Sequence, residues 1–199
     1  ERIEKVKLMR LNSKKEATKK DAGRAFQFAE CRYKDTDCII IPRHSSENRE
    51  YIPMGFLSKG TVVADSAFAV YDAPMWLFGI LTSKIHMAWV KIVGGRLETR
   101  YRYSAQLCYN TFPFPKISEE KKKQIESAAE EVLLCREDYP DKTLADLYDP
   151  DKMPDNLRQA HHALDLIIES CYQDKPFEND EERLECLFKL YEKMTKKEK

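Results

Sequence analysis

The sequence predicts an α+β fold: a small mixed or antiparallel β domain with a packed helix, followed by a C-terminal three-helix bundle. Short β-branched runs separated by turn residues fill the first 116 residues, as is typical of strands. Apolar residues recur at helical spacing from residue 118 onward. Between these parts, Pro113 and Pro115 lack an amide donor, which favours an extended boundary. We therefore expect domains at residues 1–116 and 117–199.

Length and composition limit the classes of protein to consider. The 199 residues suffice for one domain of ordinary size or two small ones, and 42% of them are hydrophobic. No apolar run approaches the ~20 residues of a membrane span, so we expect no membrane partner. Six scattered cysteines form no C-x-x-C pair, which is typical of reduced thiols in a cytoplasmic protein. The sequence begins at Glu1 rather than Met, and we expect that it was cut from something longer.

The overall charge is zero, but it is unevenly distributed. Lys and Arg number 20 against 12 Asp and Glu in residues 1–116, and 14 against 22 in residues 117–199. A basic surface attracts a polyanion and an acidic one repels it. The asymmetry therefore predicts that the first domain meets nucleic acid. The second domain would face solvent or a basic surface on another domain.

Strand signals dominate the first part of the chain. Residues 1–37 are weakly patterned and indicate a short strand or helix followed by a loop. The β-branched run at 38–42 predicts a strand. MGFLSKG at 54–60 predicts a strand that ends in a turn. TVVADSAFAVYDA at 61–73 predicts a strand pair or one bulged strand.

One helix is predicted within this part, over residues 75–93. Asp72 lies near its expected N-cap and Pro74 in its first turn, where a missing amide donor is tolerated. The glycine pair that begins at Gly94 is expected to end the helix. This is the helix that we expect to pack on the β domain.

Three amphipathic helices are predicted after the boundary. Ser118 fits an N-cap, and acidic residues follow it in the first turn. Pro154 and Asp180 open the second and third helices, each with an apolar stripe. Between the first two, Thr143 and Asp146 have the spacing of a capping box around one short turn. Helices of this kind form a small bundle.

Arginines and tyrosines crowd into residues 96–103. Arginine binds phosphate or forks onto guanine, and tyrosine supplies flat contact area. Glu98 and Arg100 are two apart on an expected strand, so we expect them to share a face. A glutamate accepts from cytosine N4, and an arginine donates to guanine O6 and N7, so this pair could read one C·G base pair. The alternative is a surface ion pair on an ordinary amphipathic strand.

The sequence contains none of the common catalytic signatures. We find no G-x-G-x-x-G, P-loop, H-E-x-x-H or G-x-S-x-G motif. Its carboxylate pairs lie at expected helix starts, where capping explains them. The neighbouring His161 and His162 point to different sides of a helix and cannot jointly hold a metal. We therefore predict no catalytic residue, no metal ligand and no cofactor in this chain.

Several long segments resemble a known family. PRHSSENREYIPMGFL, DSAFAVYDAPMWLFGILTSKIHMAWVKIVGGRLETRYRYS and YNTFPFP resemble the target recognition domain of MmeI-like type II restriction–modification enzymes. LADLYDPDKMPDNLRQAHHALDLIIESCY and DEERLECLFKLYEKM resemble the helical domain that closes the same chains. The resemblance runs from about residue 38 to residue 194, and motifs of this length are specific.

This resemblance implies that the chemistry lies elsewhere in a longer chain. Members of the family join a nuclease, an adenine-N6 methyltransferase and a DNA-reading domain. S-adenosylmethionine, and Mg for cleavage, would bind upstream parts, and the recognition domain here would be incomplete at its N-terminus. The implied partners are double-stranded DNA and the upstream methyltransferase domain. The implied function is sequence-specific recognition of duplex DNA for an enzyme that methylates adenine N6.

The resemblance also implies which residues meet DNA. In the family, the positions of Glu98 and Arg100 look like a base-specifying pair, often Lys and Asp in relatives. The alternative function is a docking module whose acidic helices bind the methyltransferase and whose basic part only holds phosphates. Further positions are expected on the DNA face, namely Arg43, Ser45, Ser46, Arg49, Ser83, Lys84, Arg96 and Arg102.

Overall fold

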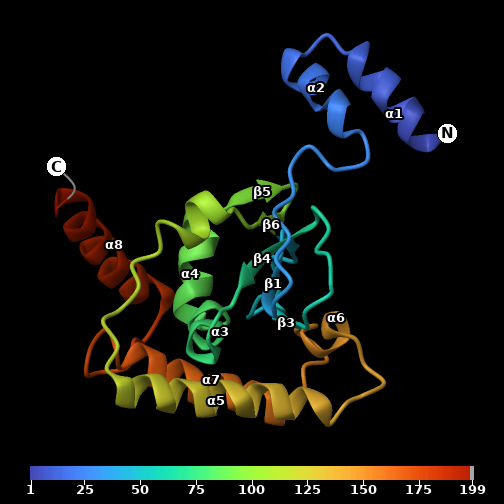
Figure 1. Ribbon diagram of the computed structural model, residues 1–199. Coiled ribbons are helices and arrows are strands. Elements are labelled where there is room, and N and C mark those ends of the chain that lie inside the picture. The colour runs from blue at the N-terminus through green and yellow to red at the C-terminus, as the bar shows by residue number, and fades with distance from the viewer. Residues whose placement is uncertain (198–199) are drawn as a thin grey trace. The chain divides into compact units, whose positions relative to one another are not determined.

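The computed structural model describes residues 1–197 and separates into two units, Glu1–Lys34 and Asp35–Lys199 (Figure 1). The expected α+β class is confirmed, because helices accompany two small antiparallel sheets within the second unit. The expected domain boundary after residue 116 does not separate the two units. It stays a prediction.

The first unit is helical, which decides between the strand and the helix that the sequence left open. It contains α1 (Arg2–Leu11), α2 (Glu16–Lys20) and the 3-10 turn η1 (Asp21–Arg24). One guanidinium, that of Arg10, ties α1 to the rest of this unit. It donates to the backbone carbonyls of Asp21, Arg24 and Gln27 at 2.7, 3.0 and 2.7 Å.

The first sheet has β1 (Cys38–Pro42) at its centre, as expected from the β-branched run. The strands β3 (Gly55–Leu57) and β4 (Ala67–Tyr71) flank it and run antiparallel to it. Ile39 pairs with residues of both neighbours, and its side chain is fully buried. Of the strand pair or single bulged strand expected over 61–73, one strand forms, β4, in continuous register with β1, and the residues before it are a loop.

The single helix expected over 75–93 is also wrong. Two helices, α3 (Met75–Leu81) and α4 (Lys84–Val93), are separated at Thr82 and Ser83. The Ser83 hydroxyl donates to the Ile80 carbonyl at 2.6 Å and accepts from the His86 amide at 3.4 Å. Hydroxyl side chains compete with the helical backbone in this way, so the break coincides with the Thr-Ser pair.

Both ends of this helical region follow from local residues. Before α3, Asp72 adopts a left-handed backbone with φ of 54°. Pro74, which is expected in the first turn, is the N-cap itself, two residues after Asp72. After α4, Gly94 is the C-cap, as expected.

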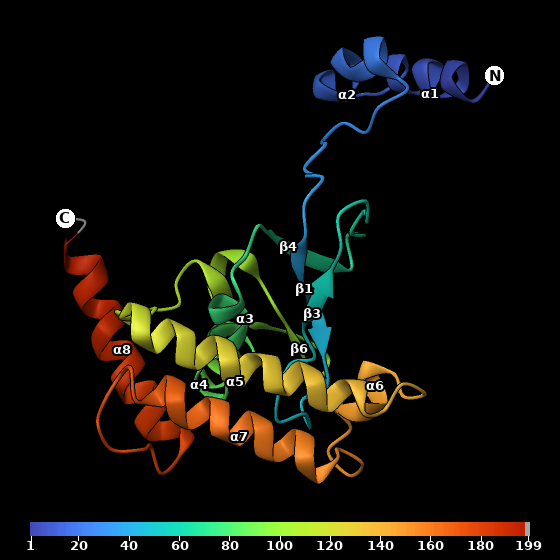
Figure 2. The same cartoon turned by 60° about the horizontal axis from the view of Figure 1, so that its bottom comes forward.

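The two long helices α5 (Glu119–Glu137) and α7 (Asp155–Glu169) lie side by side (Figure 2). Between them, the short α6 (Leu144–Leu147) begins with the expected capping box. The helix α3 packs closely on α5 at Gly79, where an added Cβ would lie 2.6 Å from Ile125 Cγ2. A larger residue would overpack this contact, so the glycine sets how near the two helices can approach.

The last helix, α8 (Asp180–Lys197), packs mainly against α4, and an ion pair between Arg183 and Glu169 joins it to α7. The Trp89 ring on α4 lies with its centre 5.2 Å from that of Phe188 and 5.8 Å from that of Tyr191. The apolar stripe of α8 is therefore covered by an indole from the other half of the chain. Two helices from beyond residue 116, α7 and α8, therefore pack on α4.

A buried carboxylate joins α7 to the start of α4. Asp165 is 2% exposed, and its two oxygens accept from the Tyr51 hydroxyl at 2.7 Å and the Lys84 backbone amide at 2.8 Å. A helix N-terminus has unpaired amides that an anion can satisfy. Asp165 supplies an acceptor oxygen for one of these amides from a different helix. Its burial raises the pKa of the carboxyl to about 7, against the pull of these two donors and the Lys84 charge.

A buried arginine makes a second connection between the helices after residue 116 and the residues before it. Arg136 on α5 donates to the Met54 carbonyl at 2.7 Å and to the Tyr148 hydroxyl at 2.9 Å. That hydroxyl also lies 2.6 Å from His161 Nε2. Burial, with the nearby Arg136 and Lys84 charges, holds the pKa of His161 well below its usual value. His161 is therefore a neutral, structural histidine.

The raised pKa of Asp165 predicts a pH dependence of stability. The unfolded carboxyl titrates near ~3.9, so between about pH 4 and pH 7 the folded protein holds a proton that the unfolded chain has released. The contribution of this carboxyl to folding stability is therefore fully present below pH 4, and it falls as pH rises to 7. We expect the free energy of unfolding of wild type, relative to that of Asp165→Asn, to fall by roughly 2–3 kcal/mol between pH 5 and pH 8.

Urea unfolding at both pH values measures this difference. Asp141→Asn, at an exposed aspartate, is the matched control and should show no such change. If the free energy of unfolding of wild type relative to Asp165→Asn stays constant or grows as pH rises, the raised pKa of Asp165 is contradicted.

Candidate nucleic-acid interface

The second sheet unites the two segments that the sequence marked as DNA-facing. Its central strand β6 (Arg100–Arg102) lies between β2 (His44–Ser45) and β5 (Gly95–Leu97), and all three are antiparallel. His44 pairs with Arg102, and Leu97 pairs with Arg100. Residues 43–49 and 96–102 are far apart in the sequence but adjacent in the structure.

One face of this sheet is basic and exposed. Residues directly opposite each other project to the same side, and successive residues alternate. The register therefore places His44, Leu97, Arg100 and Arg102 on one face, and all four are exposed. The opposite face carries Ser45 and Tyr101, which are 4% and 8% exposed, together with Arg96.

At the tip of the β5–β6 hairpin, Glu98 and Thr99 form a two-residue turn. The expected strand position of Glu98 is wrong, since its φ of 57° is left-handed. Its side chain nevertheless meets that of Arg100, whose Nη2 donates to Glu98 Oε2 at 2.9 Å. The two side chains are 76% and 49% exposed. An exposed ion pair contributes only ~0–1 kcal/mol, so either partner can exchange it for another at little cost.

Two other arginines of the predicted DNA face are held by the protein itself. The Arg96 guanidinium lies 4.2 Å from the centre of the Tyr101 ring and donates to the Lys91 carbonyl at 2.8 Å. The Arg43 guanidinium lies 4.7 Å from the Phe68 ring centre. These contacts fix two positive charges beside the sheet. They also support its packing.

Of the remaining expected positions, Arg102 shares the exposed face with Arg100. Ser46 accepts the Asn48 amide in a turn, at 3.3 Å. Arg49 reaches towards α6 and donates to the Ala145 carbonyl at 3.4 Å. All of these side chains are at least partly accessible.

Two of the expected DNA-face positions, Ser45 and Ser83, are buried in this chain. Ser45 projects to the buried side of its strand, and Ser83, at 1% exposure, caps α4. Lys84 stands next to this cap, half-buried, with its Nζ 3.7 Å from a Glu50 oxygen. The tyrosines expected to offer flat contact area, Tyr101 and Tyr103, lie in the core at 8% and 3% exposure.

One acidic residue beside this sheet was missed by the sequence analysis. The pKa of the Glu47 carboxyl is lowered by the Thr99 side chain in the hairpin turn, by its own backbone amide and by the nearby Arg100 and Arg96 charges. Nothing in the local sequence signals this proximity, because the two segments are brought together by the pairing of β2 with β6.

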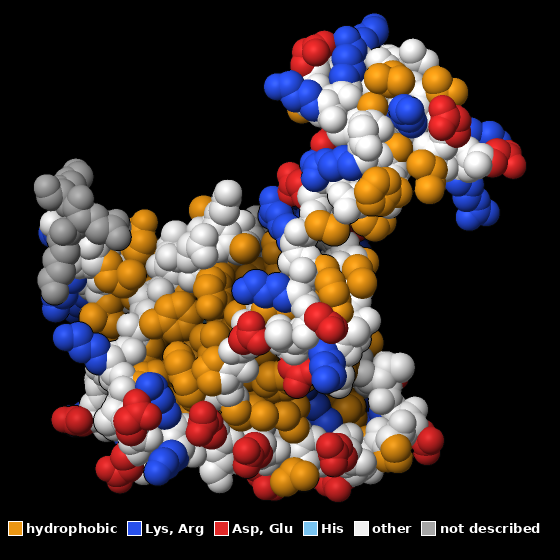
Figure 3. Space-filling model, viewed as in Figure 1, with side chains coloured by type: hydrophobic (Ala, Val, Ile, Leu, Met, Phe, Trp, Pro, Cys, Tyr) orange, Lys and Arg blue, Asp and Glu red, His pale blue; other side chains and the backbone are white. Residues whose placement is uncertain are grey.

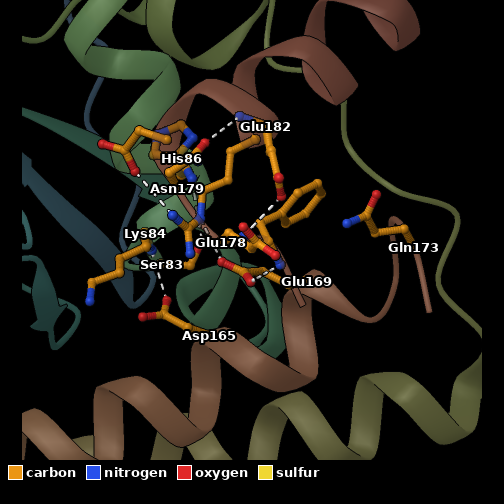
Figure 4. Close-up of polar contacts among 12 residues, drawn as sticks. Ser83, Lys84, His86, Asp165, Glu169, Gln173, Glu178, Asn179 and Glu182 are labelled. Carbon is orange, nitrogen blue, oxygen red and sulfur yellow. Dashed lines mark hydrogen bonds and ion pairs between the residues drawn. The ribbon is translucent and has the colours of Figure 1, made fainter. Parts of the chain in front are cut away.

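A separate cleft of about 630 Å³ lies between α4, α7 and α8 (Figure 4). Charged groups that line it are paired with one another across the three helices. Lys91 Nζ lies 2.7 Å from Asp180 Oδ2, and Arg183 Nε lies 2.7 Å from Glu169 Oε1. These pairs join α8 to α4 and α7, so we interpret the cleft as a structural junction.

Within residues 1–197, no group of three or more His, Cys, Asp or Glu could hold a metal ion. Nor does any helix in the described part of the chain have the length and apolar character needed to cross a membrane.

The left-handed backbone of Glu98 generates a stability prediction. Glycine adopts a positive φ without the steric cost that a Cβ introduces. Glu98→Gly should therefore be more stable than Glu98→Ala by roughly 1 kcal/mol, although both lack the carboxylate. Chemical unfolding of the two variants measures this difference.

The control is the same pair of substitutions at Leu97, in the extended strand β5, where Gly should be the less stable residue. If the Gly and Ala variants have the same order of stability at positions 97 and 98, the turn geometry is contradicted.

Comparison with known proteins identifies the family. Residues 1–116 match the target recognition domain of MmeI, and residues 117–198 match the C-terminal domain of MmeI. The DNA methyltransferase A of Bacillus subtilis (strain 168) is 48% identical over 197 residues, which are 99% of this chain and 22% of that protein. The solved structure of the type IIL restriction-modification enzyme MmeI in complex with DNA superposes with a TM-score of 0.90 at 42% identity, over 98% of this chain and 26% of that one. The chain spans about a quarter or less of both relatives, and it belongs to the MmeI family.

Proposed function

We propose that this chain reads a specific sequence of duplex DNA for a longer restriction–modification enzyme. The observation that carries the proposal is the exposed face of the sheet β2–β6–β5. It presents the guanidinium groups of Arg100 and Arg102 beside His44, with the Glu98 carboxylate at the adjacent turn. The MmeI structure that this chain resembles was solved in complex with DNA, which supports the same partner here.

The chemistry of the hairpin tip fits base recognition. In the major groove, cytosine offers a donor at N4 and guanine offers acceptors at O6 and N7. Glu98 supplies an acceptor and Arg100 a forked donor, 2.9 Å apart in the free protein. Their mutual hydrogen bond keeps the two side chains together. Because this exposed ion pair contributes little stability, each side chain can exchange its partner for a base. We propose that the pair reads one C·G base pair.

The distribution of charge supports one orientation towards DNA. Residues 1–116 carry the excess of Lys and Arg, whereas residues 117–199 carry the excess of Asp and Glu. Red side chains follow the edge formed by α5 in the space-filling view (Figure 3), and Glu119, Glu130 and Glu137 on this helix are exposed. The acidic helices would repel phosphates. The basic part would supply a salt-dependent, sequence-independent share of affinity.

The reaction itself is assigned to other parts of the longer protein. We propose that the parent methylates adenine N6 with S-adenosylmethionine and uses Mg for cleavage. The described residues do not fit either group, since they offer no metal-holding cluster and the sequence has no glycine-rich G-x-G-x-x-G loop. The role of this chain would be to hold the duplex in register while an upstream domain acts on the base.

The alternative is a docking module that gives only phosphate contacts. The ion pair between Glu98 and Arg100 is the observation that favours it, because each charge already has a partner. The two functions differ in what exchanging the pair should do. A base-reading pair changes sequence preference, whereas a phosphate-holding surface only loses affinity uniformly.

The test is the double substitution Glu98→Lys with Arg100→Asp in the full-length enzyme. It reverses donor and acceptor, so the preferred base pair at one position should change from C·G to G·C. Each bidentate contact discriminates by ~1–3 kcal/mol, so the change in relative methylation rate should be roughly 10- to 100-fold. Rates on duplexes that differ only at that position measure the preference.

The matched control exchanges an equivalent exposed pair on α8, Glu185→Lys with Lys189→Glu, whose charges lie 2.6 Å apart. It should leave the preference unchanged. If the Glu98/Arg100 exchange modifies the original site at an unchanged rate, the pair does not read that base pair and the docking alternative gains.

A further inference from the structure

Most of the positive excess of this chain lies in its first unit. Residues 1–34 contain 11 Lys and Arg against five Asp and Glu, whereas residues 35–116 contain nine against seven. The first unit therefore has a net charge of +6, and the segment that includes the reading hairpin has only +2. A strongly basic surface attracts the phosphates of a duplex. The charge thus points to a DNA contact outside the hairpin.

Exposed lysines gather around α2 and are only partly neutralised. Lys14, Lys15, Lys19 and Lys20 lie within seven consecutive residues, and all four are exposed. The one acid among them, Glu16, pairs with Lys19 at 2.8 Å. The other three lysines form no ion pair with any carboxylate of the described residues 1–197. Like charges at this spacing repel each other, and an anionic partner relieves the repulsion.

The first unit holds this lysine segment in a defined shape despite its small size. Among residues 1–34, the buried hydrophobic side chains are those of Ala22 and Ala25, so the unit has almost no core. The Arg10 guanidinium instead donates to three backbone carbonyls of residues 21–27, at 2.7, 3.0 and 2.7 Å. These bonds join α1 to the chain that follows α2. An ordered segment loses less conformational entropy when it binds a partner.

The competing partner is an acidic protein surface elsewhere in the longer enzyme. Protein interfaces bury large hydrophobic side chains and are depleted in lysine. Residues 14–20 contain no large hydrophobic residue, and those exposed on this unit, such as Leu8 and Phe28, lie outside the segment. A phosphate needs only the charge, because lysine binds it as a point charge. The composition of residues 14–20 therefore favours DNA.

We propose that Lys14, Lys15 and Lys20 bind phosphates of the duplex whose bases the hairpin reads. This inference rests on the proposed function, since it takes duplex DNA as the partner. Phosphate contacts position a protein on the duplex, and base contacts specify the sequence. Loss of these lysines is therefore expected to weaken binding to every duplex alike, without a change in the preferred base pair.

The experiment measures the dissociation constant Kd of the full-length enzyme for its preferred duplex as the NaCl concentration rises from about 50 to about 200 mM. Each phosphate contact contributes about −0.9 to the slope of the logarithm of the binding constant against that of the salt concentration. Combining Lys14→Gln, Lys15→Gln and Lys20→Gln should make this slope shallower by about 2–3, and raise Kd roughly 10- to 100-fold at about 0.1 M salt. The preference for this duplex over one altered at the C·G base pair should stay within about twofold of wild type.

A charge-matched control separates local contacts from a general effect of net charge. Lys123→Gln, Lys152→Gln and Lys175→Gln together remove three charges from exposed side chains of the acidic part, and should change the slope by less than about 1. Arginine at positions 14, 15 and 20 keeps the charge and should retain the wild-type slope. Because every substituted side chain is exposed, all three variants should unfold at the wild-type urea concentration.

The outcomes distinguish this inference from the function on which it rests. A wild-type slope in the Lys14/Lys15/Lys20 glutamine variant overturns the inference, whether or not the variant is less stable to urea. A changed base-pair preference in that variant overturns it too, because the lysines would then contact bases. Suppose instead that this variant has the shallower slope but the Glu98/Arg100 exchange leaves the preference unchanged. The proposed base reading then fails, while the phosphate contacts stand.

Discussion

The carboxylate of Asp165 is the contact on which the geometry of this protein depends most. It is buried on α7, yet its oxygens accept the Tyr51 hydroxyl and the first backbone amide of α4. Leaving a buried amide without a partner costs ~1–3 kcal/mol, so α4 is stabilised where α7 can reach it. Arg136 repeats the arrangement from α5 by donating to the Met54 carbonyl. The helical part thus completes hydrogen bonds that the β part leaves open.

This constraint extends to the proposed DNA-reading surface. The helix α4 ends at Val93, and β5 begins at Gly95, so the position of α4 sets where the hairpin leaves the core. At its other side, the hairpin is held by the pairing of β6 with β2. The tip is therefore supported from two directions, while Glu98 and Arg100 remain exposed. A rigid scaffold that presents exposed, weakly paired side chains suits a role in recognition.

Local signals in the sequence predicted the features that local chemistry determines. The strand at 38–42, the Ser118 cap and the end of α4 at Gly94 all follow from residues within one or two turns. Ser45 and Ser83 could not be placed this way, since their burial depends on strand pairing and on packing against α7. The Glu98 turn lacks the Gly or Asn that a positive φ usually requires, so the sequence predicts a strand that continues through it. The sequence brought attention to Glu98 and Arg100, but only the fold shows how they are held.

The most direct test asks whether the exposed face of the sheet β2–β6–β5 touches duplex DNA. A photo-crosslinking amino acid at Leu97, which is 44% exposed on the face of Arg100 and Arg102, would be compared with the same group at Leu134 on α5, which is 55% exposed. In the full-length enzyme bound to the duplex that it methylates, we expect crosslinks from position 97 to bases of the recognised site and none from position 134. Crosslinks from position 134 alone, with methylation intact, would contradict this account.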